Sequence, residues 1–407
     1  MDLKEIRLQF PELSEKVYGK NLVYLDNAAT SLRPESVVAK WNYMSTKCNA
    51  NIHRAVHRMA DISTEEYESS RDAVRDFIGA EFREEIVFTS GTTASVNLAA
   101  FCIGETFIKE GDEIILTECE HHSNIVPWQM MASRKSATLK VLPVDDTGHL
   151  RLDKLPELIS DKTKIVCVTH ISNVLGIVNP VKEIASICHS KGCMLLVDGA
   201  QGIVHSRVNV REMACDFYAF SGHKMYAATG TGVLYGRKTL LEKMVPYMGG
   251  GEMIDTVKWS GTTYAKTPQK FEAGTQNISS VPTFKPAIEI FNLLSTNEII
   301  NNLRSISEFV PNALKSIPGV KLYGIPATPE EKIPLFSFSV EGVHHEDIAL
   351  ILDKMGIAVR SGQMCAEPLM DRFGVTGMVR ASFAPYNTME EAEYFIKSLE
   401  KAITMLR

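Results

Sequence analysis

The amino-acid sequence predicts an α/β fold in which a mostly parallel mixed sheet forms the larger domain. From Glu85 onward, short apolar runs alternate with helical stretches. These runs are apolar at successive positions, as strands buried on both faces require. Their alternation with helices is typical of layered α/β domains. The chain has 407 residues and 45% hydrophobic content, which is enough for one large core and a smaller second one.

Seven apolar runs are the predicted strands of this sheet. They are Ile86–Thr89, Glu113–Thr117, Leu139–Leu142, Lys164–Val168, Met194–Val197, Phe217–Phe220 and Gly232–Tyr235. Ahead of them, the first twenty residues predict a helix and a short arm. Residues 23–26 then predict a strand that enters a turn at 27–30.

The pattern changes beyond about residue 285. A long helical stretch from Pro286 to about Ile317 is followed by strands punctuated with proline and glycine. Leu335–Val340 alternates with period two, which predicts an antiparallel sheet with one face covered. Met389–Arg407 predicts an amphipathic helix. We therefore expect a large domain over residues 20–285 and a smaller α+β domain over residues 1–19 and 286–407.

Composition excludes several classes of protein. The net charge is -6 and no basic stripe is present, so nucleic acid is not an expected partner. No run of about 18 apolar residues occurs, so we expect no membrane association and a cytoplasmic location. The eight cysteines form no C-x-x-C pair, and we predict neither a structural zinc site nor a disulfide framework. His53 and His57 have helical spacing without a third ligand, so no metal site is predicted.

A lysine follows one of the predicted strands. Lys224 comes directly after the run Phe217–Phe220, at the edge where ligands bind in open α/β folds. Partial burial would lower its pKa and free the amine for Schiff-base chemistry. On spacing alone, a surface lysine in a loop is an equally good interpretation.

A carboxylate follows an earlier strand. Asp198 ends the run Leu196–Val197, and an isolated Asp in such a place is often a helix N-cap. Enzymes that use pyridoxal 5′-phosphate (PLP) need an Asp against the pyridinium nitrogen, because that pair keeps the ring protonated as an electron sink. Asp198 and Lys224 could both reach a ring bound between the two strands.

A third motif lies between a strand and a helix. Gly91 is followed by Thr92 and Thr93, so a tight turn, backbone N–H groups at a helix start and two hydroxyls come together. A Gly-Thr turn alone is weak evidence. Together with Asp198 and Lys224, it indicates a phosphate site.

The order of these motifs resembles the class V aminotransferase group of fold-type I PLP-dependent transferases. Within that group the chain resembles cysteine desulfurases of the SufS type. The motifs that carry the resemblance span nearly the whole chain. They are Tyr24–Ala29, His121–Trp128, His170–Gly176, Phe271–Thr275 and Arg360–Pro368.

The resemblance implies a role for each cofactor residue. Lys224 would hold PLP and move protons at the substrate Cα, Asp198 would pair with the ring nitrogen, and His121 would stack on the ring and assist catalysis. Gln201 and Asn173 would contact the O3′ side of the ring. The residues that would hold the phosphate are Thr92, Thr93, Ser221 and His223.

The resemblance also implies a homodimer and a substrate site. Thr275 would reach the phosphate bound by the neighbouring subunit. Arg380 would clamp the substrate α-carboxylate with its planar fork, although a surface ion pair is the alternative. Arg360 would support the loop or the substrate, and Asn173 would also contact the substrate.

Cys365 is the candidate sulfur acceptor. It lies in a Gly-containing loop among polar and small residues, so we expect it to be exposed, unlike Cys102 or Cys167. By resemblance, its thiolate would take the sulfur of L-cysteine as a persulfide and leave L-alanine. L-selenocysteine is a further candidate substrate. A SufE- or SufU-like acceptor and iron–sulfur cluster assembly are the implied partner and pathway.

The chain departs from the SufS pattern in two places. Ser90 and Ala94 replace an arginine and a glutamate, and Gln363 and Met364 stand where histidines often precede the cysteine. Two alternatives therefore stay open. One is a class V aminotransferase or C–S β-lyase that does not use Cys365, and the other is a non-enzymatic role.

Overall fold

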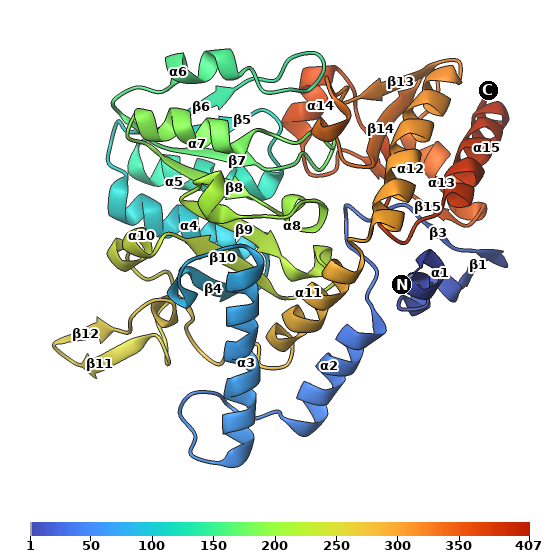
Figure 1. Ribbon diagram of the computed structural model, residues 1–407. Helices are drawn as coiled ribbons and strands as arrows, with labels where there is room; N and C mark the ends of the chain where they lie inside the picture. Colours follow the sequence, from blue (N-terminus) through green and yellow to red (C-terminus); the bar gives the residue numbers. More distant parts are fainter. Residues whose placement is uncertain (1) are drawn as a thin grey trace.

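The computed structural model describes residues 2–407, and its largest element is a seven-stranded sheet (Figure 1). In spatial order its strands are β4 (Ile86–Thr89), β10 (Gly232–Gly236), β9 (Phe217–Ser221), β8 (Met194–Asp198), β7 (Thr163–Thr169), β5 (Glu113–Thr117) and β6 (Thr138–Leu142). The pairs from β9 to β6 are parallel, whereas β10 is antiparallel to both neighbours. The seven predicted strands and the mostly parallel mixed sheet are confirmed.

The strands are apolar at successive positions because both faces of the sheet are covered. In β9, Phe217 and Ala219 pack into one core while Tyr218 and Phe220 pack into the other. The first core includes α4 (Thr92–Phe107) and α5 (Val126–Lys135), and the second includes α3 (Arg58–Phe77) and α7 (Val181–Ser190). Because successive side chains of a strand point to opposite faces, the sheet contributes to both cores.

Apart from three helices that pack on the smaller sheet, the other helices are shorter or lie at the edges of these layers. They are α1 (Leu3–Arg7), α2 (Glu35–Lys47), α6 (Leu155–Leu158), α8 (Gly202–His205), α9 (Val210–Met213), α10 (Lys238–Lys243), α11 (Phe284–Leu293) and α14 (Glu367–Phe373). Across residues 2–407, no helix combines the length and the hydrophobicity of a membrane span.

A second, smaller sheet carries the C-terminal part of the chain (Figure 1). Its antiparallel strands are β13 (Val320–Tyr323), β14 (Leu335–Val340), β17 (Met378–Ser382) and β16 (Arg360–Gly362), in that order. Helices α12 (Asn297–Ser316), α13 (His345–Lys354) and α15 (Met389–Leu406) complete its core. The predicted C-terminal amphipathic helix is confirmed by α15.

The prediction that one face of β14 is uncovered was wrong. Phe336 and Phe338 enter the core of the small sheet, but Leu335 packs with Ile171 of the large part. Ser337 on the same side donates to the Val174 carbonyl. Both faces of β14 are therefore buried, because the 171–178 loop of the large part covers the second one.

The predicted single helical stretch from Pro286 to Ile317 is broken in the structure. Helix α11 ends at Leu293, and α12 begins at Asn297 after Thr296 adopts an extended conformation. The break lets α11 pack against α2 and α3 while α12 packs against α15. Both segments are amphipathic, so periodicity alone could not reveal that they serve different cores. The domain boundary at residue 285 stays a prediction.

Three strand pairs lie outside the two main sheets. β1 (Lys16–Val17) pairs with β2 (Lys20–Asn21), and β3 (Val23–Tyr24) pairs in parallel with β15 (Ile357–Ala358). β11 (Ile254–Lys258) and β12 (Gly261–Tyr264) form a hairpin that projects from the body, at the lower left of Figure 1. Trp259 at its tip is fully exposed.

Candidate active site

A cavity of about 320 Å³ lies where the main sheet meets the Cys365 loop. It gathers most of the predicted site residues from strand ends and loops that are distant in sequence. These are Thr92, Thr93, His121, Asn173, Asp198, Gln201, Ser221, His223, Lys224, Arg360, Cys365 and Arg380. Thr275 alone among the predicted residues is missing from the cavity wall, and it is exposed.

Lys224 ends the short 3-10 helix Gly222–Lys224 that follows β9. This turn is tight, since a Cβ on Gly222 would lie 2.3 Å from the Thr231 hydroxyl. Burial lowers the pKa of Lys224 to about 8, although the Asp198 carboxylate partly offsets the effect. A lysine so placed holds an appreciable fraction of free, nucleophilic amine near neutral pH.

Asp198 is the last residue of β8 and is buried. Its Oδ1 accepts a hydrogen bond from the Ala200 N–H at 2.9 Å. Burial raises the pKa of Asp198, while this N–H and Lys224 act in the opposite direction. A cation brought against this carboxylate would be held strongly, because little water is available to screen the pair.

The predicted phosphate turn begins α4. Gly91, with φ of 151°, precedes the helix, and the Thr92 N–H donates to Ser221 Oγ at 2.7 Å. Thr92 Oγ1 and Ser221 Oγ also lie 2.7 Å apart, so these two hydroxyls fix the turn against the end of β9. Thr93 is exposed to the cavity at the start of a 16-residue helix, where N–H groups and the helix dipole favour an anion.

His121 precedes the 3-10 helix η3 (His122–Asn124) and lines the cavity. Its Nδ1 accepts the Ser123 N–H at 3.0 Å, so the neutral ring carries its proton on Nε2. Burial and then the nearby Lys224 lower the pKa of His121 to about 4. The neutral ring therefore suits stacking on an aromatic group and donating a hydrogen bond.

Two buried polar atoms on the cavity wall lack a hydrogen-bond partner among the described residues. They are Gln201 Oε1 and Arg380 Nε. Gln201 Nε2 donates to the Ala28 carbonyl at 2.7 Å, which holds the amide in place. An unpartnered buried polar atom is costly, so both atoms indicate a bound molecule that completes their bonding.

The two arginines share one carboxylate. Arg360 Nη2 lies 2.7 Å from Asp26 Oδ2, and Arg380 Nη2 lies 3.3 Å from Asp26 Oδ1. Arg380 is buried, and burial lowers its pKa to about 10. Asp26 lies within the motif Tyr24–Ala29, but its role could not be predicted, because nothing local in the sequence shows that it faces two arginines.

Asn173 connects the cavity to the Cys365 loop. Its Nδ2 donates to the Met364 carbonyl at 2.9 Å, and its own carbonyl accepts from Arg380 Nη1 at 2.8 Å. Cys365 is exposed and lines the cavity, whereas the other seven cysteines are buried. The predicted contrast between Cys365 and the buried Cys102 and Cys167 is confirmed.

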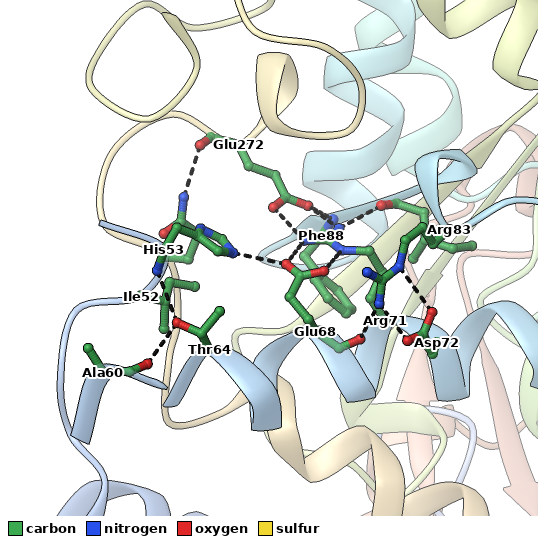
Figure 2. A network of polar contacts seen from close by, with 12 residues as sticks. Ile52, His53, Ala60, Thr64, Glu68, Arg71, Asp72, Arg83, Phe88 and Glu272 are labelled. Carbon is green, nitrogen blue, oxygen red and sulfur yellow. Dashed lines mark hydrogen bonds and ion pairs between the residues drawn. The ribbon is translucent and has the colours of Figure 1, made fainter. Parts of the chain in front are cut away.

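Lys224, Asp198 and the turn at Thr92–Thr93 form the predicted cofactor cradle. A buried ionic network supports β4, the strand that leads into this turn (Figure 2). Arg71 on α3 donates to both carboxylate oxygens of Glu272 at 2.7 and 2.9 Å and to the Ile86 carbonyl at 2.7 Å. Glu272 Oε1 also accepts from the Phe88 N–H at 2.7 Å. The network thus ties β4, which leads into the phosphate turn, to the segment that carries Thr275.

Comparisons with known proteins agree with this site. The family model "Aminotransferase class-V" matches residues 23–395, and the chain belongs to this family of PLP-dependent enzymes. A "probable cysteine desulfurase" of Halalkalibacterium halodurans is 45% identical over 401 residues, which cover 98% of each chain. One from Vibrio cholerae is 41% identical and covers both chains fully.

Solved structures give the same result. The cysteine desulfurase CsdA of Escherichia coli has a TM-score of 0.91 at 38% identity, with full coverage of both chains. The apo cysteine desulfurase of Thermococcus onnurineus has a TM-score of 0.93 at 38% identity, covering 100% of this chain and 99% of that one. These comparisons confirm the resemblance and the fold class that the sequence predicted.

The residues of the cavity fit PLP. Lys224 is an amine for covalent attachment, Asp198 is a buried carboxylate for the ring nitrogen, and the start of α4 is an anion site. The unpartnered oxygen of Gln201 can accept a hydrogen bond from the bound group.

Proposed function

We propose that this protein is a PLP-dependent cysteine desulfurase that uses Cys365 as its sulfur acceptor. The observation that carries the proposal is one cavity lined by a half-buried amine of lowered pKa, Lys224, and by an exposed thiol, Cys365. An aminotransferase needs the amine but not the thiol. The cysteine desulfurases to which the chain is similar support the same choice.

Each residue has a role that follows from its position. When bound, PLP supplies an electron sink that weakens the bonds at the substrate Cα and Cβ. Lys224 removes and returns the proton at Cα, since its amine has a lowered pKa. Arg380 binds the substrate carboxylate through its unpartnered Nε, and Arg360 supports it through Asp26.

Sulfur transfer then uses Cys365. The Cys365 thiolate attacks the substrate sulfur, so an S–S bond forms as the Cβ–S bond breaks. The electron pair of that bond stays with Cβ, which takes up a proton. L-cysteine and one thiol thus become L-alanine and one persulfide, with atoms and electrons balanced.

The persulfide would then pass to another protein. Because Cys365 is exposed, a SufE- or SufU-like acceptor of the cytoplasm could approach it, and iron–sulfur cluster assembly is the pathway we propose. L-selenocysteine is a second candidate substrate. Its selenium could leave without help from Cys365, whereas the sulfur of L-cysteine should need the thiol.

We also propose that the protein works as a homodimer. Thr275 lies outside the cavity of its own chain and is exposed, as a residue that serves a neighbouring subunit would be. The hairpin β11–β12 exposes Val257, Trp259 and Tyr264. Light scattering should give twice the monomer mass, and a monomeric active enzyme would contradict the proposal.

The test is a product balance on L-cysteine with a reductant, for wild type and Cys365→Ala. The wild type should release sulfide and an equal amount of L-alanine, and the variant should lose at least about 10²-fold in rate, as for removal of a nucleophile. Cys102→Ala, a buried cysteine, is the matched control. Unchanged sulfide release in Cys365→Ala would sink the proposal, and pyruvate with ammonia would indicate a β-lyase.

A further inference from the structure

The backbone around Cys365 is strained. Met364 and Cys365 have φ of 54° and 55°, in the left-handed region, and the Ala366 N–H donates to the Gln363 carbonyl at 3.0 Å. Positive φ at both central residues is the signature of a type I′ turn, which strongly prefers Asn-Gly. An L-residue is disfavoured in this region because its Cβ crowds the following carbonyl oxygen. Neighbouring contacts must therefore hold this turn.

Three hydrogen bonds from the large part hold the turn. The His122 N–H donates to the Cys365 carbonyl at 2.8 Å, and Asn173 Nδ2 donates to the Met364 carbonyl at 2.9 Å. The third uses a side chain of η3, because the Glu367 N–H donates to His122 Nε2 at 3.2 Å. His122 therefore makes two contacts just after the thiol-bearing Cα, once through its backbone and once through its ring, while Asn173 holds the chain just before it.

The segment that carries His122 is itself firmly anchored. Glu120 is fully buried, and its carboxylate accepts from the Thr169 N–H at 2.8 Å and from Asn124 Nδ2 at 2.7 Å. Asn124 Oδ1 in turn accepts from Trp128 Nε1 at 3.1 Å. Glu120 thus joins β7 to η3, and Asn124 joins η3 to α5. Because these bonds hold η3 in place, His122 can anchor the exposed turn.

We propose that His122 is the positioning residue for the sulfur-accepting thiol. Its ring nitrogen accepts the Glu367 N–H and keeps the Met364–Cys365 turn in the conformation that presents the thiol to the cavity. This role replaces none of the cofactor contacts, because His121 and not His122 lines the cavity. The inference rests on the proposed function of Cys365.

The test compares four variants with the wild-type holoenzyme. His122→Ala and His122→Leu remove the acceptor, and the leucine keeps most of the ring volume in case the smaller side chain disturbs folding. His122→Gln restores a side-chain carbonyl acceptor. Glu367→Ala is the matched control, because it removes an exposed carboxylate 3.8 Å from His122 but keeps the backbone N–H.

Two readouts are needed. Hydrogen exchange of the 363–368 backbone reports the turn directly and does not depend on turnover. Loss of one hydrogen bond, worth about 1 kcal/mol net, should speed this exchange about 5-fold in the Ala and Leu variants. Turnover of L-cysteine should fall by at least a similar factor, while turnover of L-selenocysteine and the visible absorption of the cofactor should not change.

The His122→Gln and Glu367→Ala variants should behave like wild type. Unchanged exchange in both Ala and Leu variants, or equal losses with both substrates, would overturn the proposal. Failure of the proposed function has a different signature, namely Cys365→Ala releasing sulfide as fast as wild type. In that case the exchange comparison still decides whether His122 holds the turn.

Discussion

The cofactor cradle and the Cys365 turn lie in one cavity, but they are built in opposite ways. The cradle rests on buried ionic and hydroxyl contacts, such as Arg71 with Glu272 and Thr92 with Ser221. The turn is exposed, contains two non-glycine residues with positive φ, and is held by hydrogen bonds from loops of the other part.

This difference separates two tasks. A cofactor that stays bound benefits from a rigid and water-poor site, because fixed dipoles and charges then need no rearrangement. A thiol that must take sulfur from a substrate and give it to another protein has to be reachable. We infer that the cradle determines which bonds can be activated, and that the turn determines whether sulfur is captured.

The largest expected effect comes from the cradle. Lys224→Ala removes both the attachment point and the amine that moves protons at Cα. Turnover of L-cysteine and of L-selenocysteine should both fall by at least about 10³-fold, since general acid–base catalysis alone is worth 10²–10⁴. Cys365→Ala should impair only the first substrate. If the two variants changed the ratio of L-cysteine turnover to L-selenocysteine turnover equally, the proposed division of tasks between cradle and turn would be wrong.

An intermediate effect should appear in stability. Arg71 is fully buried, and Arg71→Ala leaves the buried Glu272 carboxylate without its cation, which should cost about 3–5 kcal/mol of the free energy of unfolding. Arg75 on the same helix pairs with Asp72 and Asp76 near the surface, so Arg75→Ala should cost about 0–1 kcal/mol. Urea denaturation with PLP in excess measures both values. Similar losses of the free energy of unfolding in the two variants would show that the buried Arg71 network stabilises the protein no more than the surface pairs of Arg75 do.

The smallest expected effect concerns the turn. Asparagine tolerates positive φ better than methionine, so Met364→Asn should stabilise the turn by about 0.5–1 kcal/mol and slow hydrogen exchange at residues 363–368. Met364→Ala, which removes the side chain without this preference, is the control. Faster hydrogen exchange in the Asn variant than in the Ala variant would show that the positive φ of Met364 does not strain the turn.

The sequence predicted the strands of the main sheet because all except the edge strand β6 are buried on both faces and are therefore apolar at successive positions. It also predicted the cavity residues, since Asp198 and Lys224 each follow such a strand and parallel strands end at a common edge. These signals are local, so a single sequence carries them.

Features that depend on distant partners were missed. The break between α11 and α12 arises because the two helices serve different cores, although each is amphipathic. Asp26 gains its importance from Arg360 and Arg380, more than 300 residues away. His122 was visible in a motif beside His121, but its contact with Glu367 depends on how the small sheet is docked.

The most direct test of sulfur capture is a single turnover without reductant or acceptor protein. Holoenzyme mixed with L-cysteine should form one L-alanine per subunit and then stop, and mass spectrometry should find one added sulfur atom on the peptide that contains Cys365. Continued L-alanine formation, or an unmodified Cys365 after the first turnover, would contradict the account.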